Sequence, residues 1–230
     1  MNIALILSGG TGTRLGGEIP KQYLKVGKRE ILFYSLQTLA DCEQIDGIQI
    51  VAHSDWRTWI DERLIEYGLK AKLKGYSNPG ETRQLSIFNG LCDIKQYADQ
   101  NDGVLIHDAA RPNLSLEMVN ACIDALKEHD GVLPVLPMKD TVYLSSNGTT
   151  ISSLLDRKQV VAGQAPEMFV LGKYWQANSV LLPDKIYAIN GSTEPAIMAG
   201  MDIAMIEGDE TNYKITTKAD LERFADSVGD

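Results

Sequence analysis

The chain has 230 residues, 44% of them hydrophobic and 23% charged, an ordinary composition for a folded protein with a sizeable core. The length predicts a single domain over 1–230, and the net charge of −9 disfavours nucleic acid and anionic membranes as partners. We expect a cytoplasmic protein, because no stretch reaches membrane-spanning length and the N-terminus lacks a signal-peptide pattern.

Short apolar runs alternate with amphipathic stretches along the chain. The apolar runs predict strands at 3–7, 48–52, 71–74, 103–106, 131–135 and 203–207. Apolar residues at helical spacing predict helices over 31–39, 56–67, 85–92 and 119–126, and Thr217 with Asp220 indicates a capping box at the start of a last helix. This alternation predicts an α/β protein with a Rossmann-like, mostly parallel sheet.

The segment 139–162 breaks the alternation. Two β-rich pieces, 141–144 and 149–154, flank Asn147-Gly148, and an Asn-Gly pair between such pieces is typical of a hairpin. We therefore expect a β-hairpin arm that protrudes from the sheet.

A glycine-rich loop follows the first predicted strand, with Arg14 inside it and Pro20-Lys21 shortly after. Glycines allow backbone N–H groups to approach phosphate oxygens, and fixed cations neutralise the phosphate charge. The loop is neither a Walker loop nor a dinucleotide fingerprint. It therefore predicts a site for a polyphosphate at the carboxyl ends of the strands.

The run LSGGTGTRLG followed by PKQYL resembles the signature of sugar- and polyol-phosphate nucleotidyltransferases. Within these it resembles most the 2-C-methyl-D-erythritol 4-phosphate cytidylyltransferase family, and the similarity extends over essentially the full chain. The resemblance implies that Arg14 and Lys21 grip the triphosphate of CTP and stabilise charge at the α-phosphorus. It also implies nucleotide contacts from Ser8, Gly9, Gly10, Thr11 and Gly12.

Two further motifs of the same family lie at 80–86 and 107–112. The first resembles a pyrimidine-recognition turn, in which Gly80, Glu81 and Ser86 would read the base. The second is HDAARP, where the resemblance implies that Asp108 holds Mg²⁺, directly or through water, since this hard cation prefers oxygen ligands. Ala109 would contact the nucleotide and Arg111 the acceptor or the metal's water shell, whereas we expect His107 to be a structural hydrogen-bonding residue.

The acceptor half of the resemblance rests on three other positions. Arg157 matches a residue that binds the acceptor's phosphate, and Lys214, in an NxKxT motif, would bind that phosphate or the α-phosphate. Thr141 matches a residue that an arm lends to the neighbouring subunit. We therefore expect a homodimer in which Thr141 of one chain lies near Arg157 and Lys214 of the other.

Two segments depart from the family pattern, both on the acceptor side. The usual Thr-Pro-Gln is Ala165-Pro166-Glu167 here, and Asn190-Gly191-Ser192 stands where Thr-Asp-Glu or Thr-Asp-Asp is usual. These departures leave the identity of the acceptor open.

The resemblance thus implies a cytidylyltransferase that makes a CDP-alditol and pyrophosphate from CTP and a polyol phosphate. No general base is needed, because a phosphate monoester is already a nucleophile at neutral pH. The HDAARP motif favours 2-C-methyl-D-erythritol 4-phosphate, an isoprenoid precursor, as acceptor. Ribitol 5-phosphate, for cell-wall or capsule polymers, is the alternative within the class. A non-catalytic nucleotide-binding protein is the alternative of another class.

Overall fold

The sheet is built around β1 (Asn2–Leu7), a strand buried on both faces. In the computed structural model, which describes residues 1–10 and 19–229, β1 pairs in parallel with β4 (Gly47–Val51) and β6 (Gly103–Asp108). Ala4 and Ile6 pack into one hydrophobic layer, and Ile3 and Leu5 pack into the other. An unbroken apolar run is what a parallel strand covered on both faces requires.

The main sheet contains eight strands and has a parallel core. Its order is β12-β7-β11-β6-β1-β4-β5, and β10 pairs with β7 farther along the same edge as β11. Only β10 and β11 run antiparallel to their neighbours. The remaining bounds are Leu73–Ser77 for β5, Gly131–Pro137 for β7, Val161–Gly163 for β10, Glu167–Val170 for β11 and Ile203–Glu207 for β12. The predicted parallel core is confirmed, with the antiparallel β10 and β11 as additions.

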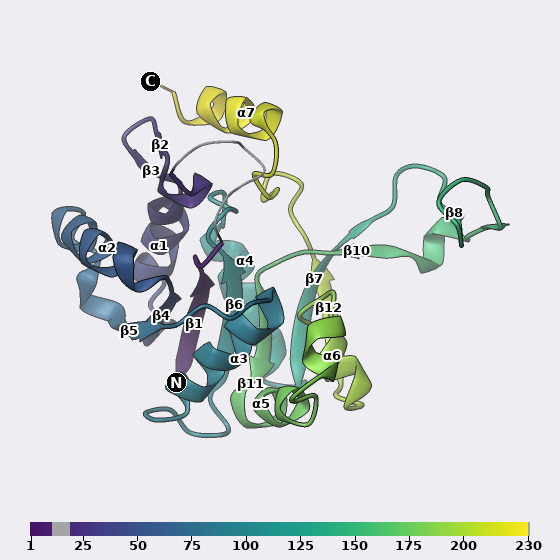
Figure 1. Ribbon diagram of the computed structural model, residues 1–230, viewed down its shortest axis with the longest axis horizontal. Helices are drawn as coiled ribbons and strands as arrows, with labels where there is room; N and C mark the ends of the chain where they lie inside the picture. Colours follow the sequence, from purple (N-terminus) through teal and green to yellow (C-terminus); the bar gives the residue numbers. More distant parts are fainter. Residues whose placement is uncertain (11–18, 230) are drawn as a thin grey trace.

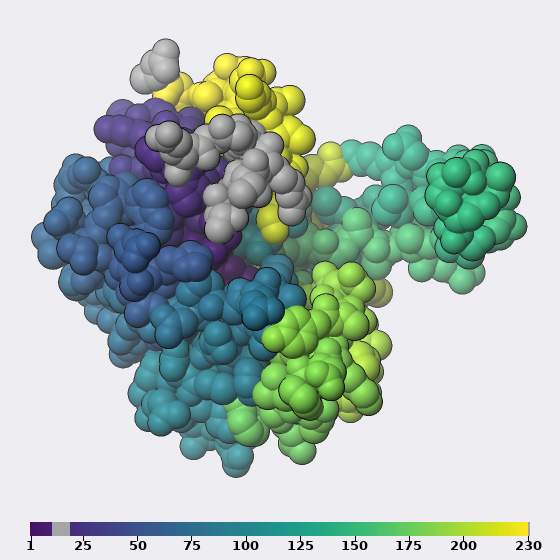
Figure 2. Space-filling model, in the orientation of Figure 1, coloured from purple at the N-terminus to yellow at the C-terminus, as the bar shows by residue number. Residues whose placement is uncertain are grey.

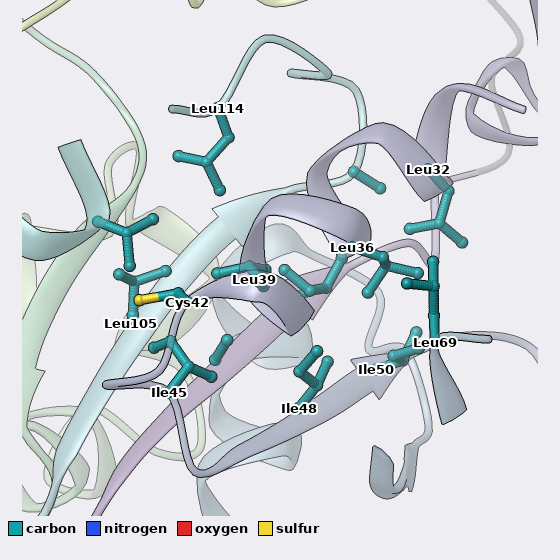
Figure 3. Packing of buried hydrophobic residues seen from close by; sticks show 14 of the residues in the cluster. Leu32, Leu36, Leu39, Cys42, Ile45, Ile48, Ile50, Leu69, Leu105 and Leu114 are labelled. Atoms are coloured by element: carbon teal, nitrogen blue, oxygen red, sulfur yellow. The ribbon is translucent and has the colours of Figure 1, made fainter. Parts of the chain in front are cut away.

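Helices cover both faces of the sheet (Figure 1). One layer holds α1 (Ile31–Asp41), α2 (Ser54–Glu66) and α4 (Leu116–Leu126); the other holds α3 (Arg83–Ile94), α5 (Leu171–Ser179) and α6 (Glu194–Met198). Figure 3 shows the first layer, where Leu36 and Leu39 of α1 lie over Ile48 and Ile50 of β4. All four predicted helices are confirmed within a few residues at their ends.

The last helix, α7 (Lys218–Val228), packs apart from these two layers. Its Phe224 is fully buried against Val26, Ile31 and Ile215, next to the small hairpin of β2 (Lys25–Val26) and β3 (Arg29–Glu30). The predicted capping box is confirmed: the Thr217 hydroxyl accepts from the Asp220 N–H at 3.1 Å and the Asp220 carboxylate accepts from the Thr217 N–H at 2.8 Å.

One predicted strand position differs from the structure. The strand expected at 71–74 begins later, at Leu73, because Lys70–Lys72 form a 3-10 turn before it. The residues around Lys214 form an irregular segment between β12 and α7.

The segment between β7 and β10 forms an arm that extends from the body (Figures 1 and 2). Its hairpin is confirmed but short, with β8 (Tyr143–Leu144) paired to β9 (Ser153–Leu154). At its tip Asn147 Oδ1 accepts hydrogen bonds from the backbone of Thr149 and Thr150. Gly148 has φ +73°, a conformation that favours glycine. The Asn-Gly pair therefore makes the predicted turn.

In the described ranges, no helix is long and apolar enough to cross a membrane.

All three cysteines are free; Cys42 and Cys122 are buried, and Cys92 is partly buried. Cys122 lies in the core, within α4.

We predict that Thr217→Ala lowers the free energy of unfolding by about 1 kcal/mol, because the first turn of α7 loses its side-chain cap. Thr217→Ser, which keeps the hydroxyl, should stay close to the unsubstituted protein. Urea unfolding of the three proteins measures this difference. Equal stabilities of the alanine and serine variants would contradict the assigned role of the cap.

Candidate active site

A cavity of about 550 Å³ opens where β1 and β6 end, beside the N-terminus of α3. Most of the described residues predicted to bind nucleotide, metal or acceptor line it. They are Gly9, Gly10, Lys21, Gly80, Glu81, Ser86, Asp108, Ala109 and Lys214. Thr11, Gly12 and Arg14 lie outside the described residues. The cavity therefore lies beyond the carboxyl ends of the strands, where the polyphosphate site is expected.

A larger hollow, of about 760 Å³, lies between α1 and α7 and is lined by none of the predicted residues. Arg29 Nη1 donates to Gln37 Oε1 at 2.9 Å, and the Thr38 hydroxyl donates to the Leu114 carbonyl at 2.9 Å. These polar groups are already bonded to one another. The smaller cavity, which the predicted residues line, is therefore the candidate active site.

The start of the glycine-rich loop is held by the PKQYL segment. Gln22 Nε2 donates to the carbonyls of Ser8 and Gly10, at 2.8 and 2.7 Å, and the Tyr23 hydroxyl donates to the Ser8 carbonyl at 3.0 Å. A Cβ on Gly9 would come within 2.5 Å of Pro79, so this position requires glycine. The sequence pattern indicates a site role for Lys21 in this segment. It does not indicate that Gln22 and Tyr23 hold the loop.

Gly80 and Ser86 shape the turn that opens α3. The Gly80 N–H donates to Ser86 Oγ at 3.0 Å, and that hydroxyl donates to the Thr82 carbonyl at 3.0 Å. Thr82 caps the helix by accepting from the Leu85 N–H at 3.1 Å. A Cβ on Gly80 would lie 2.4 Å from Leu85 Cβ. The turn is therefore tightly closed beside the cavity.

Asp108, at the end of β6, holds three cations. Its Oδ1 lies 3.1 Å from Arg83 Nε, and its Oδ2 lies 3.0 Å from Lys214 Nζ and 3.5 Å from Arg111 Nε. Burial alone would raise the pKa of Asp108, but the three cations outweigh it and hold that pKa well below its usual range. The carboxylate is therefore ionised and gathers positive charge at the cavity wall.

The backbone brings Arg111 and Lys214 to this carboxylate from distant parts of the chain. Arg111 Nη1 donates to the Asn212 carbonyl at 2.8 Å, and Asn212 Nδ2 donates to the Ala165 carbonyl at 2.8 Å. The Ile215 N–H donates to the Ala110 carbonyl at 2.8 Å. These bonds fasten the segment around Lys214 to the HDAARP turn. Lys21 Nζ joins them by donating to the Ile215 carbonyl at 2.6 Å.

Arg83, Ser192 and Glu167 belong to the same cluster, and we had assigned none of them to the site. Arg83 Nη1 donates to Ser192 Oγ at 2.7 Å, and Ser192 Oγ donates to the Glu167 carboxylate. Burial raises the pKa of Glu167, against the lowering effect of Arg83. In the sequence, Glu167 and Ser192 are marked as candidate site residues only by the departures from the family pattern at 165–167 and 190–192.

His107 is fully buried and does not line the cavity. Its Nε2 lies 2.9 Å from the Arg111 carbonyl, and burial lowers its pKa to about 4. The ring is therefore neutral near neutral pH, and its N–H can donate to that carbonyl. The expected structural role of His107 is confirmed by these contacts.

Thr141 and Arg157 lie in the arm and not in the cavity of their own chain. Together they line a separate hollow with Leu154, Leu155 and Asp156. Arg157 Nη1 donates to the Lys139 carbonyl at 2.8 Å, across the base of the arm. Within one chain, Thr141 and Arg157 therefore share one hollow of the arm, and the expected contacts between the arm and a second chain stay a prediction.

Two carboxylates of the described part of the chain line the cavity, those of Glu81 and Asp108, and Asp108 is the one expected to hold Mg²⁺. The described residues contain no group of three or more His, Cys, Asp or Glu that could hold a metal ion. Magnesium commonly binds through one or two carboxylates together with substrate phosphates. The site therefore fits an ion that arrives with a polyphosphate and not one held by the protein alone.

Three comparisons bear on this site. The family model described as "IspD: 2-C-methyl-D-erythritol 4-phosphate cytidylyltransferase" matches residues 2–228. A ribitol-5-phosphate cytidylyltransferase from Vibrio parahaemolyticus is 32% identical over 96% of this chain and 93% of that protein. A 2-C-methyl-D-erythritol 4-phosphate cytidylyltransferase from Geobacter metallireducens is 31% identical, over 95% and 93%.

A solved structure extends the likeness to the fold. The crystal structure of 4-diphosphocytidyl-2C-methyl-D-erythritol synthase from Anaerococcus prevotii superposes with a TM-score of 0.83 and 26% identity. The match covers 99% of this chain and 95% of that one. The similarity therefore includes the sheet, both helical layers and the arm.

We predict that Gly80→Ala weakens CTP binding about tenfold or more, because a Cβ there must displace the turn that opens α3. Gly75→Ala is the matched control, since its Cβ would meet only the Gln49 side chain at 3.6 Å or more. Isothermal titration calorimetry gives both dissociation constants. Unchanged affinity in a folded Gly80→Ala protein would remove this turn from the nucleotide site.

Proposed function

This chain belongs to the IspD family of cytidylyltransferases, and from that membership we propose the reaction and the acceptor. The protein transfers CMP from CTP to a polyol phosphate and releases pyrophosphate. A phosphate oxygen of the acceptor attacks the α-phosphorus in line, and pyrophosphate leaves. The observation that carries the proposal is the convergence of Arg83, Arg111 and Lys214 on Asp108, beside the glycine-rich loop.

The charge of this cluster suits the reaction. Three cations against one carboxylate leave an excess of two positive charges around Asp108, and Arg83 and Lys214 of this cluster line the cavity. Two phosphate groups repel each other as they approach, and fixed cations offset that repulsion without any rearrangement of water. Lys21, which also lines the cavity, and Arg14 are proposed to bind the triphosphate. Magnesium, when bound, adds neutralisation of the phosphate charge.

The turn at 80–86 is proposed to select the base. Gly80, Glu81 and Ser86 line the cavity, so backbone groups of this turn, and the Ser86 hydroxyl oxygen as an acceptor, can face the edge of a pyrimidine. A site that pairs with hydrogen-bonding groups rejects analogues that lack them more strongly than an apolar pocket does. CTP is therefore the expected nucleotide, with Ser8, Gly9, Gly10, Thr11, Gly12 and Ala109 around its phosphates and ribose.

Ribitol 5-phosphate is the first acceptor to test. The two departures from the family pattern, at 165–167 and 190–192, fall on the acceptor side, and the Vibrio parahaemolyticus relative is named for this substrate. The second candidate is 2-C-methyl-D-erythritol 4-phosphate, which the HDAARP motif and the Geobacter metallireducens relative favour. In both cases Arg111 and Lys214 are proposed to bind the acceptor's phosphate.

The arm is proposed to complete the acceptor site of a second copy of the chain. Tyr143, Leu144, Ile151 and Leu154 of the arm are exposed apolar residues, and such a cluster marks an interaction surface. Thr141 and Arg157 share one hollow of this arm. In a homodimer they would reach Lys214 and Arg111 of the partner together.

A pyrophosphate-release assay tests the proposed reaction. We expect turnover with CTP and Mg²⁺ plus ribitol 5-phosphate or 2-C-methyl-D-erythritol 4-phosphate, and far slower turnover with UTP, ATP or GTP. Lys21→Ala should lower kcat by about 10²–10³, the usual cost of removing a preorganised charge contact. Comparable kcat/KM for a purine triphosphate, or no release with either acceptor, would reject the assignment.

Subunit exchange tests the shared site. A Lys214→Ala chain and an Arg157→Ala chain, each impaired alone, should recover about a quarter of full activity when mixed, because half of the dimers are hybrids with one intact site. Mixing Thr141→Ala with Arg157→Ala is the matched control. That pair should recover nothing, since both residues lie on one arm and every hybrid site lacks one of them. Full activity of a monomer would rule out the shared site.

A further inference from the structure

Glu167 is a buried carboxylate to which the proposed reaction assigns no step. It begins β11, the antiparallel strand inserted between β6 and β7, and it is 8% exposed. A buried carboxylate is costly unless it is paired and hydrogen-bonded. Its hydrogen-bond partner among the described residues is the hydroxyl of Ser192, so the two residues have to be understood together.

Ser192 connects Glu167 to the active site. A hydroxyl has one hydrogen to donate and can accept through its lone pairs. Ser192 gives its hydrogen to Glu167 and accepts from Arg83 Nη1 at 2.7 Å. Arg83 Nε then donates to Asp108 Oδ1 at 3.1 Å. The result is a continuous series of hydrogen bonds. It runs from the buried carboxylate of Glu167, through Ser192 and Arg83, to the carboxylate of Asp108 at the cavity wall.

These hydrogen bonds fix the guanidinium of Arg83 on two sides. Nη1 is held by Ser192 and Nε by Asp108, while Nη2 makes no hydrogen bond to the described residues. Arg83 lines the cavity, and one third of its side chain is exposed. A planar guanidinium held in this way offers its remaining donors to an anion in a fixed geometry.

We propose that Arg83 binds the phosphate of the acceptor, and that Glu167 and Ser192 are positioning residues that hold it there. This inference rests on the proposed function. The acceptor is favoured over CTP because Arg83 shares Asp108 with Arg111 and Lys214, the two residues proposed for the acceptor. Their excess of two positive charges over Asp108 matches a phosphate monoester, which carries about −1.5 to −2 at neutral pH.

Ser192→Ala tests the proposal. Removing the hydroxyl frees Nη1 of Arg83, and we expect the KM for the acceptor to rise about tenfold, the scale of one hydrogen bond to a charged group. The dissociation constant of CTP, measured by calorimetry, should change less than about twofold. Ser192→Thr keeps a hydroxyl and Glu167→Gln keeps an oxygen that can accept from Ser192, so both should stay within about threefold of the unsubstituted KM.

Ser35→Ala is the matched control, because it removes another buried hydroxyl, bonded to the Leu32 carbonyl at 3.1 Å in α1, at a residue that does not line the cavity. It should leave the acceptor KM unchanged. The proposal is overturned if Ser192→Ala folds and keeps the original acceptor KM, or if its CTP affinity falls in parallel. An equal rise of KM in Ser192→Thr and Glu167→Gln would also overturn it, since packing would then explain the effect.

A second measurement separates this inference from the proposed function. Inorganic phosphate should raise the melting temperature of the unsubstituted protein more than that of Ser192→Ala. If neither acceptor is turned over but this difference is seen, the proposed reaction fails and the anion site at Arg83 stands. Equal phosphate effects on the two proteins would overturn the anion site itself.

Discussion

The active-site cavity depends on one carboxylate. Asp108 is almost fully buried at the end of β6, and three cations contact its two oxygens. Burying a charge is unfavourable unless it is paired, and here the pairing also brings together residues far apart in the sequence. Without Asp108, Arg83, Arg111 and Lys214 would repel one another. The cations are therefore in place for a phosphate before any substrate binds.

The sheet determines which groups surround this carboxylate. β6 lies between β1 and β11, so Asp108 has the glycine-rich loop on one side and Glu167 on the other. β11 runs antiparallel to β6, and its first residue, Glu167, pairs with Ile106. One strand inserted in the opposite direction thus places a buried carboxylate two residues from the end of β6. That placement allows the chain of hydrogen bonds through Ser192 to Arg83.

Local patterns were enough to predict much of this architecture. The apolar run of β1, the helical spacing in α1 to α4 and the Thr217–Asp220 cap each depend on neighbours in sequence, and the structure confirms them. β11 was not predicted, because its apolar run is only three residues long and begins after the charged Glu167. The irregular course around Lys214 was missed because contacts with Ala110 and Arg111 determine it.

The sequence by itself determined the family and the existence of the arm, and it singled out Lys21, Asp108, Arg111 and Lys214 as candidate site residues. Only the tertiary structure decided that Arg83, Ser192 and Glu167 join this cluster, and that Thr141 and Arg157 lie together on one arm. The physical reason is the separation along the sequence between the residues that interact. Strand and helix patterns record interactions between residues a few positions apart, whereas Arg83 and Ser192 are 109 positions apart, so their hydrogen bond exists only once the sheet brings its strands together.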